Sequence, residues 1–143
     1  MDDYDERGVA TYIRFFESLT DESIEDFRQF AAPDVRYRDP FIDCHGPDEV
    51  IAAMHHWFEV MEDLTFDIDQ HARAGDVVLG HWTMRFHIKK MPRQAWCLEG
   101  MSKVTFDDQG RIRDAIDYWD ATPLLGAIPV LGTFVRLAKR VAS

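Results

Sequence analysis

The chain has 143 residues and a formal net charge of −10, and residues 1–70 alone carry 19 acidic and 5 basic side chains. This acidic balance argues against a nucleic-acid partner, because binding to phosphates needs a basic patch. The length and the 46% hydrophobic content fit one globular domain, residues 1–143, with its own core. No apolar run is long enough for a membrane span and the N-terminus is acidic, so we expect a cytoplasmic protein with no membrane partner.

The first third of the chain is predicted to be mostly helical. Apolar residues at helical spacing predict an amphipathic helix over residues 5–18. A second, shorter helix is predicted from Glu22 to Ala32, where Pro33 ends it. The apolar face of the first helix consists of Val9, Tyr12, Ile13, Phe16 and Leu19.

A short extended segment and a third helix follow. Residues 35–39 are predicted to be extended, since Pro40 disfavours a helical conformation at the residue before it. Residues 43–46 are expected to form a loop. The third helix is predicted from Gly46 to about Glu62, because proline and acidic residues are favoured in a first helical turn.

Four strands are predicted after the third helix, over residues 64–69, 77–89, 94–106 and 111–120, with turn residues between them. In the last strand, alternation places Ala115, Asp117 and Trp119 on one face. This element order predicts an α+β fold in which a curved antiparallel sheet covers three helices and leaves a cone-shaped space for a ligand.

Residues 121–143 form a C-terminal extension that is unusually apolar. We expect its end to be a short helix with Phe134, Val135, Leu137 and Val141 inside and the basic side chains outside. Three roles remain open for this tail: a lid over the pocket, an exchange with a partner chain, or contact with a membrane surface.

Three stretches resemble the NTF2-like superfamily, and within it the SnoaL-like and ketosteroid-isomerase-like proteins. The stretch from Ala32 to Pro40 is similar to a family segment that ends in an acidic residue and proline. Gly46-Pro-Asp-Glu-Val-Ile51 resembles the start of the family's third helix. Residues 106–112, followed by Asp117-Tyr-Trp-Asp120, resemble its last hairpin, where limonene-epoxide-hydrolase-like members carry a similar motif. The resemblance implies an NTF2-like cone and a homodimer formed through the outer face of the sheet.

The resemblance also implies roles for single residues. Asp39 falls where ketosteroid isomerases place their general base, and Asp117 falls where epoxide hydrolases and SnoaL-type cyclases place an acid. Other positions depart from these patterns. Phe15 replaces the isomerases' oxyanion-hole tyrosine and Ser102 replaces their protonated acid. The arginine and aspartate of the epoxide hydrolases correspond to Trp82 and Met84.

We predict that Asp39 and Asp117 are catalytic and share one apolar pocket. Two acids in such surroundings would have raised, separated pKa values and could exchange protons near neutral pH. The predicted reaction is acid–base chemistry of the isomerase, cyclase or hydrolase type on a small hydrophobic molecule. The predicted ligand-binding residues are Phe15, Phe16, Tyr37, Phe41, Trp57, Phe58, Met61, Trp82, Met84, Ser102 and Trp119.

Two other interpretations stay open. In the first, both acids are structural: Asp39 caps the loop before Gly46, and Asp117 pairs with Arg113 or Arg36. In the second, the pocket binds a small molecule without turnover, so the sequence leaves open whether the protein is an enzyme. The histidines are not spaced for a metal site, and we expect neither a metal nor another cofactor.

Overall fold

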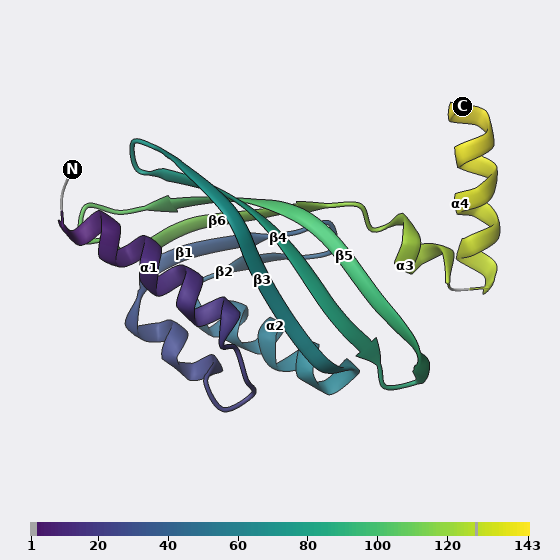
Figure 1. Cartoon of the computed structure of the whole chain (residues 1–143), viewed down its shortest axis with the longest axis horizontal. Coiled ribbons are helices and arrows are strands. Elements are labelled where there is room, and N and C mark those ends of the chain that lie inside the picture. Colours follow the sequence, from purple (N-terminus) through teal and green to yellow (C-terminus); the bar gives the residue numbers. More distant parts are fainter. Residues whose placement is uncertain (1–2, 128) are drawn as a thin grey trace.

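The structure is a computed structural model that describes residues 3–127 and 129–143 (Figure 1). A curved sheet covers the helices of the N-terminal half, and one C-terminal helix stands away from them. The elements in chain order are α1 (Asp3–Glu17), the 3-10 helix η1 (Ile24–Gln29), β1 (Ala31–Arg38), β2 (Asp43–His45), α2 (Pro47–Val60), β3 (Met61–Ala74), β4 (Val77–Ile88), β5 (Met91–Phe106), β6 (Ile112–Trp119), α3 (Thr122–Gly126) and α4 (Pro129–Ala142).

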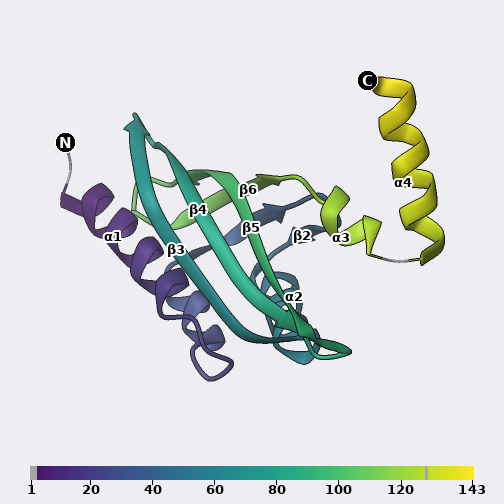
Figure 2. The ribbon, with the colours of Figure 1, turned by 45° about the vertical axis from the view of Figure 1, so that its right-hand side comes forward.

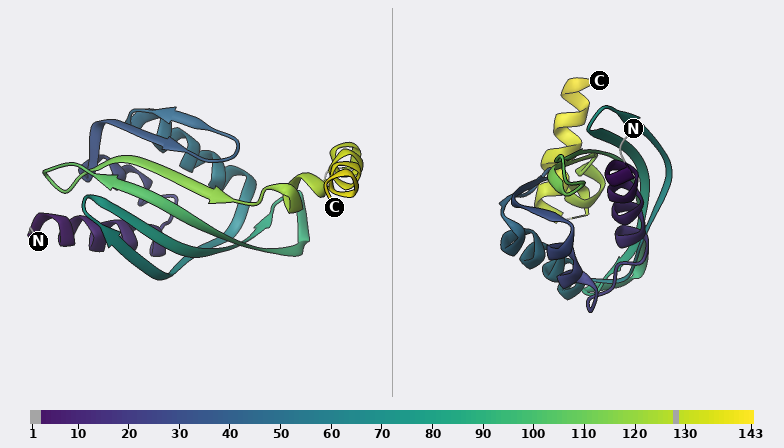
Figure 3. Two further views of the ribbon diagram at one scale, coloured as in Figure 1. Left: turned by 90° about the horizontal axis from the view of Figure 1, so that it is seen from above. Right: turned by 90° about the vertical axis from the view of Figure 1, so that its left-hand side faces the viewer.

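The six strands form one sheet in the order β2-β1-β6-β5-β4-β3. Neighbouring strands are antiparallel except for β1 and β6, which run parallel. The two views in Figure 3 show that the sheet curves around the helices without closing into a barrel. The predicted α+β fold with a curved sheet is therefore confirmed, with one parallel strand pair that the hairpin pattern did not indicate.

Two predictions near the start of the sheet are wrong. The second helix is shorter than expected, because β1 already begins at Ala31 and Ala32 precedes a proline, a position that disfavours helix. Residues 43–45, expected in a loop, form the edge strand β2. A tight turn makes this possible: the backbone N–H of Asp39 donates to the Ile42 carbonyl at 3.0 Å and closes the β1–β2 hairpin.

The main core lies between the concave face of the sheet and the helices α1, η1 and α2. Ile24, Val35 and Met54 are almost completely buried there. Full burial of an aliphatic side chain of this size contributes about 1.5–3 kcal/mol. The third helix begins at Pro47 as predicted and ends at Val60, two residues early, where β3 starts without a loop.

A second, smaller core lies towards the other end of the sheet. Phe86, Trp96 and Leu98 are buried there, on strands β4 and β5. Leu124 and Ala127, from α3 and the residue after it, pack against this cluster. The short helix α3 is thereby attached to the sheet.

Helix α4 stands beyond the end of the sheet (Figures 1 and 2). Its apolar residues were predicted to lie inside, but Phe134, Leu137 and Val141 are all exposed. The helix packs against α3 and does not bury this face against its own domain. Within the described ranges, no helix has the length and apolar character needed to cross a membrane.

Candidate functional site

Four neighbouring strands each place one polar or aromatic side chain on the concave face of the sheet. Tyr37 comes from β1, Asp117 from β6, Ser102 from β5 and Trp82 from β4. Ser102 lies directly opposite Asp117 in the β5–β6 pairing, and Tyr37 lies opposite Ala115, two residues before Asp117. The strand register therefore brings together residues that are up to 80 positions apart.

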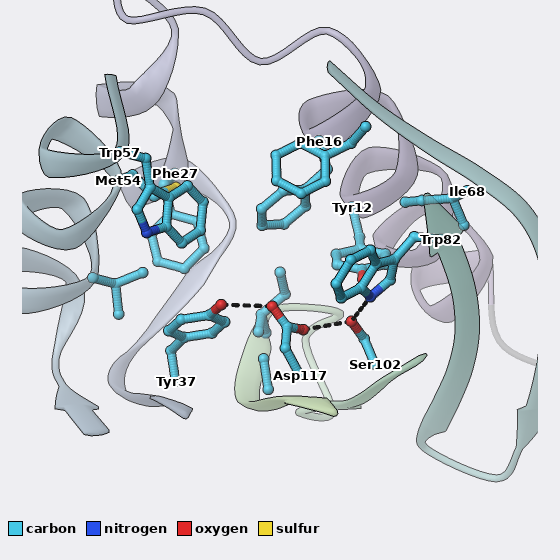
Figure 4. A pocket seen from close by; sticks show the side chains of 14 residues that line it. Tyr12, Phe16, Phe27, Tyr37, Met54, Trp57, Ile68, Trp82, Ser102 and Asp117 are labelled. Atoms are coloured by element: carbon cyan, nitrogen blue, oxygen red, sulfur yellow. Dashed lines mark hydrogen bonds between the residues drawn. The ribbon is translucent and has the colours of Figure 1, made fainter. Parts of the chain in front are cut away.

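These four side chains form a continuous hydrogen-bonded chain (Figure 4). The hydroxyls of Tyr37 and Ser102 each donate to one oxygen of the Asp117 carboxylate, both at 2.5 Å. The indole N–H of Trp82 donates to the Ser102 hydroxyl at 2.8 Å. Short distances of this kind are typical of hydrogen bonds to an ionised carboxylate. Because Tyr37 and Ser102 both donate, the network favours the charged form of Asp117.

Gly100 makes room for this arrangement. It lies opposite Trp82 in the β4–β5 pairing. A Cβ atom at position 100 would collide with the Trp82 indole ring. The absence of a side chain at Gly100 thus lets the ring lie flat over β5 and reach Ser102, which is 3% exposed.

Asp117 has an unusual protonation equilibrium. Burial raises the pKa of its carboxyl from 3.8 to about 6, although the hydrogen bonds from Ser102 and Tyr37 act in the opposite direction. The negative charge of Asp39 adds a smaller contribution that also raises the pKa of Asp117. A carboxyl with a pKa near 6 is mostly ionised at pH 7 and can both accept and return a proton.

Two buried tyrosines surround this carboxyl. Burial and the charge of Asp117 raise the pKa of the Tyr37 hydroxyl well above its usual value. The same two causes raise the pKa of Tyr12, which reaches the site from α1, while the Ser102 hydroxyl acts in the opposite direction. Both phenols therefore stay protonated at neutral pH and remain available as donors.

Asp117 lies at the junction of two cavities. The inner cavity has a volume of about 30 Å³ and is lined by the hydroxyl-bearing residues Tyr12, Tyr37 and Ser102 among apolar side chains. Such a volume holds one or two water molecules. The outer cavity has a volume of about 470 Å³, within the range that small-molecule sites occupy. Asp117, Tyr37 and Trp82 line both cavities.

Asp39 has different surroundings. Its Oδ1 atom accepts hydrogen bonds from the backbone N–H groups of Phe41 and Ile42, at 2.7 and 2.9 Å. The side chain lines the outer cavity at the β1–β2 turn. Asp39 therefore caps its turn, as expected if it is a structural residue. Asp117 does not pair with either arginine proposed for it, because Arg36 pairs with Asp43 and Arg113 pairs with Asp76.

Most of the predicted ligand-binding residues line one of the two cavities, and two do not. Phe15 packs in the core against Phe27 and Phe30, behind the cavity wall. Phe58 follows Trp57 on α2 but lines a separate cavity at the surface, together with His55 and Lys89. The outer cavity is lined by Tyr37, Phe41, Trp57, Met61, Trp82, Met84 and Trp119, and the inner one also by Phe16 and Ser102.

Several residues of the site were not predicted from the sequence, above all Tyr12. It lies one helical turn before Phe15, and its position on the apolar face of α1 indicated only core packing. The structure shows instead that its hydroxyl lies within electrostatic reach of Asp117 and Ser102. In the described part of the chain, no group of three or more histidine, cysteine or acidic side chains could hold a metal ion.

A comparison with sequence families agrees with the fold. The sequence profile of the SnoaL-like domain matches residues 12–115, which is most of the chain. The chain belongs to the SnoaL-like family. No curated protein matches this SnoaL-like chain in sequence.

Solved structures related to this SnoaL-like protein have the same fold at low sequence identity. A protein described as a SnoaL-like polyketide cyclase from Jannaschia sp. CCS1 has a TM-score of 0.77 and 18% identity, with 90% of this chain and 95% of that one covered. An NTF2-like protein of unknown function from Burkholderia pseudomallei has a TM-score of 0.74 and 20% identity, with 87% and 96% covered. An LEH-like epoxide hydrolase from M. tuberculosis has a TM-score of 0.66 and 17% identity, with 98% and 97% covered. Identities this low are evidence for the fold alone.

Proposed function

We propose that this SnoaL-like protein binds a small hydrophobic molecule in the outer cavity and that Asp117 exchanges a proton with it. The observation that carries this proposal is the placement of Asp117. Its carboxyl faces the outer cavity, is hydrogen-bonded by Tyr37 and Ser102, and has a pKa of about 6. A general base works best when its pKa lies near the working pH.

The chemistry follows from the groups around that carboxylate. Asp117 accepts a proton from a C–H group beside a carbonyl, and the electron pair of that bond moves towards the carbonyl oxygen. The protonated acid then returns the proton to the substrate at the same or another atom. In the water-activating form, a water molecule in the inner cavity would lose its proton to Asp117 and attack one carbon of an epoxide. The ring C–O bond at that carbon would break, and the proton on Asp117 would pass to the ring oxygen, which gives a diol and restores the carboxylate. Similar folds in proteins described as a polyketide cyclase and an epoxide hydrolase support both forms of the proposal.

The aromatic wall of the outer cavity supports a hydrophobic substrate. Trp57, Trp82 and Trp119 all line it, together with Phe66 and Phe86. Aromatic side chains offer large apolar surfaces and bind apolar ring systems by offset or edge contacts. Val60 at the end of α2, Phe41 in the β1–β2 turn and Leu124 in α3 also line this cavity.

Binding without turnover is the second candidate function. The observation that favours it is the completeness of the hydrogen-bonded chain from Tyr37 through Asp117 and Ser102 to Trp82. A buried polar network with all of its members satisfied can serve structure alone. In that case the cavity would bind the same class of molecule, and Asp117 would only order its wall.

Proton exchange in heavy water tests the proposal without knowledge of the natural substrate. 2-Tetralone has acidic hydrogens beside its carbonyl, and NMR follows their replacement by deuterium. A separate assay, the conversion of cyclohexene oxide to its diol, tests the water-activating form of the proposal. Asp117→Asn should slow whichever reaction the protein accelerates by about 10²-fold or more, while the dissociation constant of the compound changes little. Asp39→Asn is the matched control and should keep most of the rate. Equal rates for the wild type and Asp117→Asn would contradict the proposal, and binding without turnover by both would favour the second candidate.

A further inference from the structure

Trp82 lies at the far end of the hydrogen-bonded chain from Asp117 and is linked to it through Ser102 (Figure 4). Its indole N–H donates to the Ser102 hydroxyl at 2.8 Å, and that hydroxyl donates to the Asp117 carboxylate at 2.5 Å. Trp82 and Ser102 are only 5% and 3% exposed, so bulk water does not compete for these bonds. Trp82 also lines both cavities, next to the carboxylate that the proposed function uses.

The direction of the hydrogen bond from Trp82 limits what the Ser102 hydroxyl can do. A serine hydroxyl has one proton to donate and two lone pairs to accept with, whereas an indole N–H can only donate. Ser102 must therefore accept from Trp82 and keep its own proton for another partner. An ionised carboxylate can only accept, so the Asp117 oxygen takes that proton in its hydrogen bond with Ser102.

Other partners for the Ser102 proton lie nearby. The Tyr12 hydroxyl lines the same inner cavity and is close enough to Ser102 for a hydrogen bond. The inner cavity also has room for water. Without the indole donor, the Ser102 hydroxyl would be free to turn and donate to Tyr12 or to water. The Asp117 carboxylate would then lose one of its donors for part of the time.

Two glycines allow Trp82 to reach Ser102 diagonally across the β4–β5 pair. Ser102 lies opposite Gly80, which leaves the space beside the serine without a side chain from β4. Trp82 lies opposite Gly100, where a Cβ atom would collide with the indole ring. Phe66 on β3 packs edge-on against the indole, with 6.3 Å between the ring centroids. Strand pairing and ring packing therefore hold the indole N–H at the serine oxygen.

We propose that Trp82 is a positioning residue for Asp117: its indole N–H orients the Ser102 hydroxyl so that the serine proton stays on the carboxylate. The inference rests on the proposed function, because it concerns the same acid. Donation from Trp82 also polarises the O–H bond of Ser102 and strengthens its hydrogen bond to Asp117. Trp82, Ser102 and Asp117 thus form a relay that favours the ionised carboxylate, which is the form that accepts a proton.

NMR titration of the labelled carboxyl carbon of Asp117 measures the effect of this relay. Trp82→Phe removes the N–H donor but keeps an aromatic ring, and it should raise the pKa of Asp117 by about 0.5 unit, an increase of about threefold in proton affinity. In a chain that already carries Ser102→Ala, the same substitution should change the pKa by less than about 0.2 unit, because the relay is already broken. An unchanged pKa in Trp82→Phe, or an equal rise in both backgrounds, would overturn the proposal.

Trp96→Phe is the matched control. Trp96 is also a buried tryptophan, but it belongs to the second core, and its indole N–H has no hydrogen-bond partner among the described residues. The substitution removes the same atoms without breaking a hydrogen bond to the site, so the pKa of Asp117 should stay the same. A similar rise in Trp96→Phe and Trp82→Phe would show that looser packing of the sheet moves the pKa, and would overturn the proposal.

A measurement on the unsubstituted chain tests the relay even if Trp82→Phe does not fold. In nitrogen-labelled protein, the indole N–H signals of Trp82 and Trp96 are followed between about pH 4 and pH 9. The Trp82 signal should shift with a midpoint near 6, the pKa of Asp117, and most of this shift should be lost in Ser102→Ala. The Trp96 signal should stay in place through that midpoint. A Trp82 signal that does not follow the titration of Asp117 would overturn the proposal.

The deuterium exchange of 2-tetralone separates this inference from the proposed function. A base is active when ionised, so in Trp82→Phe the fall in rate at low pH should begin about 0.5 unit higher. The midpoint of this pH profile is the readout, because lost packing in the outer cavity would change KM without moving it. Titration results as expected, with no turnover by any variant, would support the relay and contradict the proposed function. A rate that depends on Asp117, with an unchanged midpoint in Trp82→Phe, would overturn the relay alone.

Discussion

The two carboxylates that the sequence grouped as a pair, Asp117 and Asp39, have contrasting surroundings. Asp117 projects from the middle of the sheet, is held by the side-chain hydroxyls of Tyr37 and Ser102, and has a raised pKa. Asp39 lies in a turn and accepts two backbone N–H groups. Hydroxyl donors can be reorganised when a carboxyl gains a proton, whereas a backbone turn loses hydrogen bonds. The comparison indicates that one acid is suited to proton exchange and the other to holding the chain.

Asp117 and Asp39 should differ most in how they change the stability of the fold with pH. A carboxyl whose pKa is raised from 3.8 to about 6 on folding stabilises the fold below about pH 4 and loses that contribution as the pH rises through 6. This shift corresponds to about 3 kcal/mol. In the wild type, this carboxyl should therefore lower the free energy of unfolding by about 3 kcal/mol between about pH 4 and pH 7. In Asp117→Asn this decrease should be absent. Urea denaturation at several pH values measures it, and Asp39→Asn should leave the decrease in place.

Other carboxylates in the chain change the stability with pH in the opposite direction. The informative quantity is therefore the difference in the free energy of unfolding between Asp117→Asn and the wild type at each pH. A hydrogen bond from Arg36 lowers the pKa of Asp43, although burial acts against it. Burial also acts to raise the pKa of Asp107, but hydrogen bonds from the 107–111 turn outweigh it and lower that pKa. These groups lose their contribution as the pH falls through their lowered pKa values. If the curves for Asp117→Asn and the wild type were parallel over this range, Asp117 would not be the buried acid described above.

A smaller effect is expected from the donors that hold Asp117. Ser102→Ala removes one hydrogen bond to the carboxylate, so the ionised form loses about 1.5–3 kcal/mol of stabilisation and the pKa of Asp117 rises by roughly 1–2 units. Tyr37→Phe should act in the same direction. NMR titration of the labelled carboxyl carbon measures the shift. Tyr118→Phe is the matched control, because Tyr118 is 58% exposed on the other face of the sheet; a similar shift in that variant would argue against the assigned donors.

The smallest effect is expected at the turn. Asp39→Ala removes the acceptor of the two N–H groups of Phe41 and Ile42 and should lower the free energy of unfolding by about 1–2 kcal/mol. Asp39→Asn keeps an oxygen at the same place and should cost less. Thermal unfolding of the two variants at pH 7 distinguishes them. Equal loss in both would mean that the charge of Asp39, and not its role as an acceptor, matters for the fold.

Local patterns in the sequence were sufficient for most of the longer elements of this protein, but not for η1, β2 and α3. Helical spacing predicted α1 and the position of α2, and period-two alternation predicted β4, β5 and β6. Alternation also correctly placed Ala115, Asp117 and Trp119 on the same face of β6, where they line the cavities. These features depend on neighbours within a few residues, which a single sequence displays directly.

Only the tertiary structure decided which of these residues meet. The parallel pairing of β1 with β6 brings Tyr37 to Asp117, and the register of β5 brings Ser102 to the same carboxylate, although no local pattern links the three. Burial within that arrangement raises the pKa of Asp117, while a turn of a few residues engages Asp39. The sequence by itself determined most of the longer elements and the face on which their residues lie, because periodicity is local. The structure decided the partners of Asp117, its protonation and the exposure of α4, because these depend on packing between distant segments.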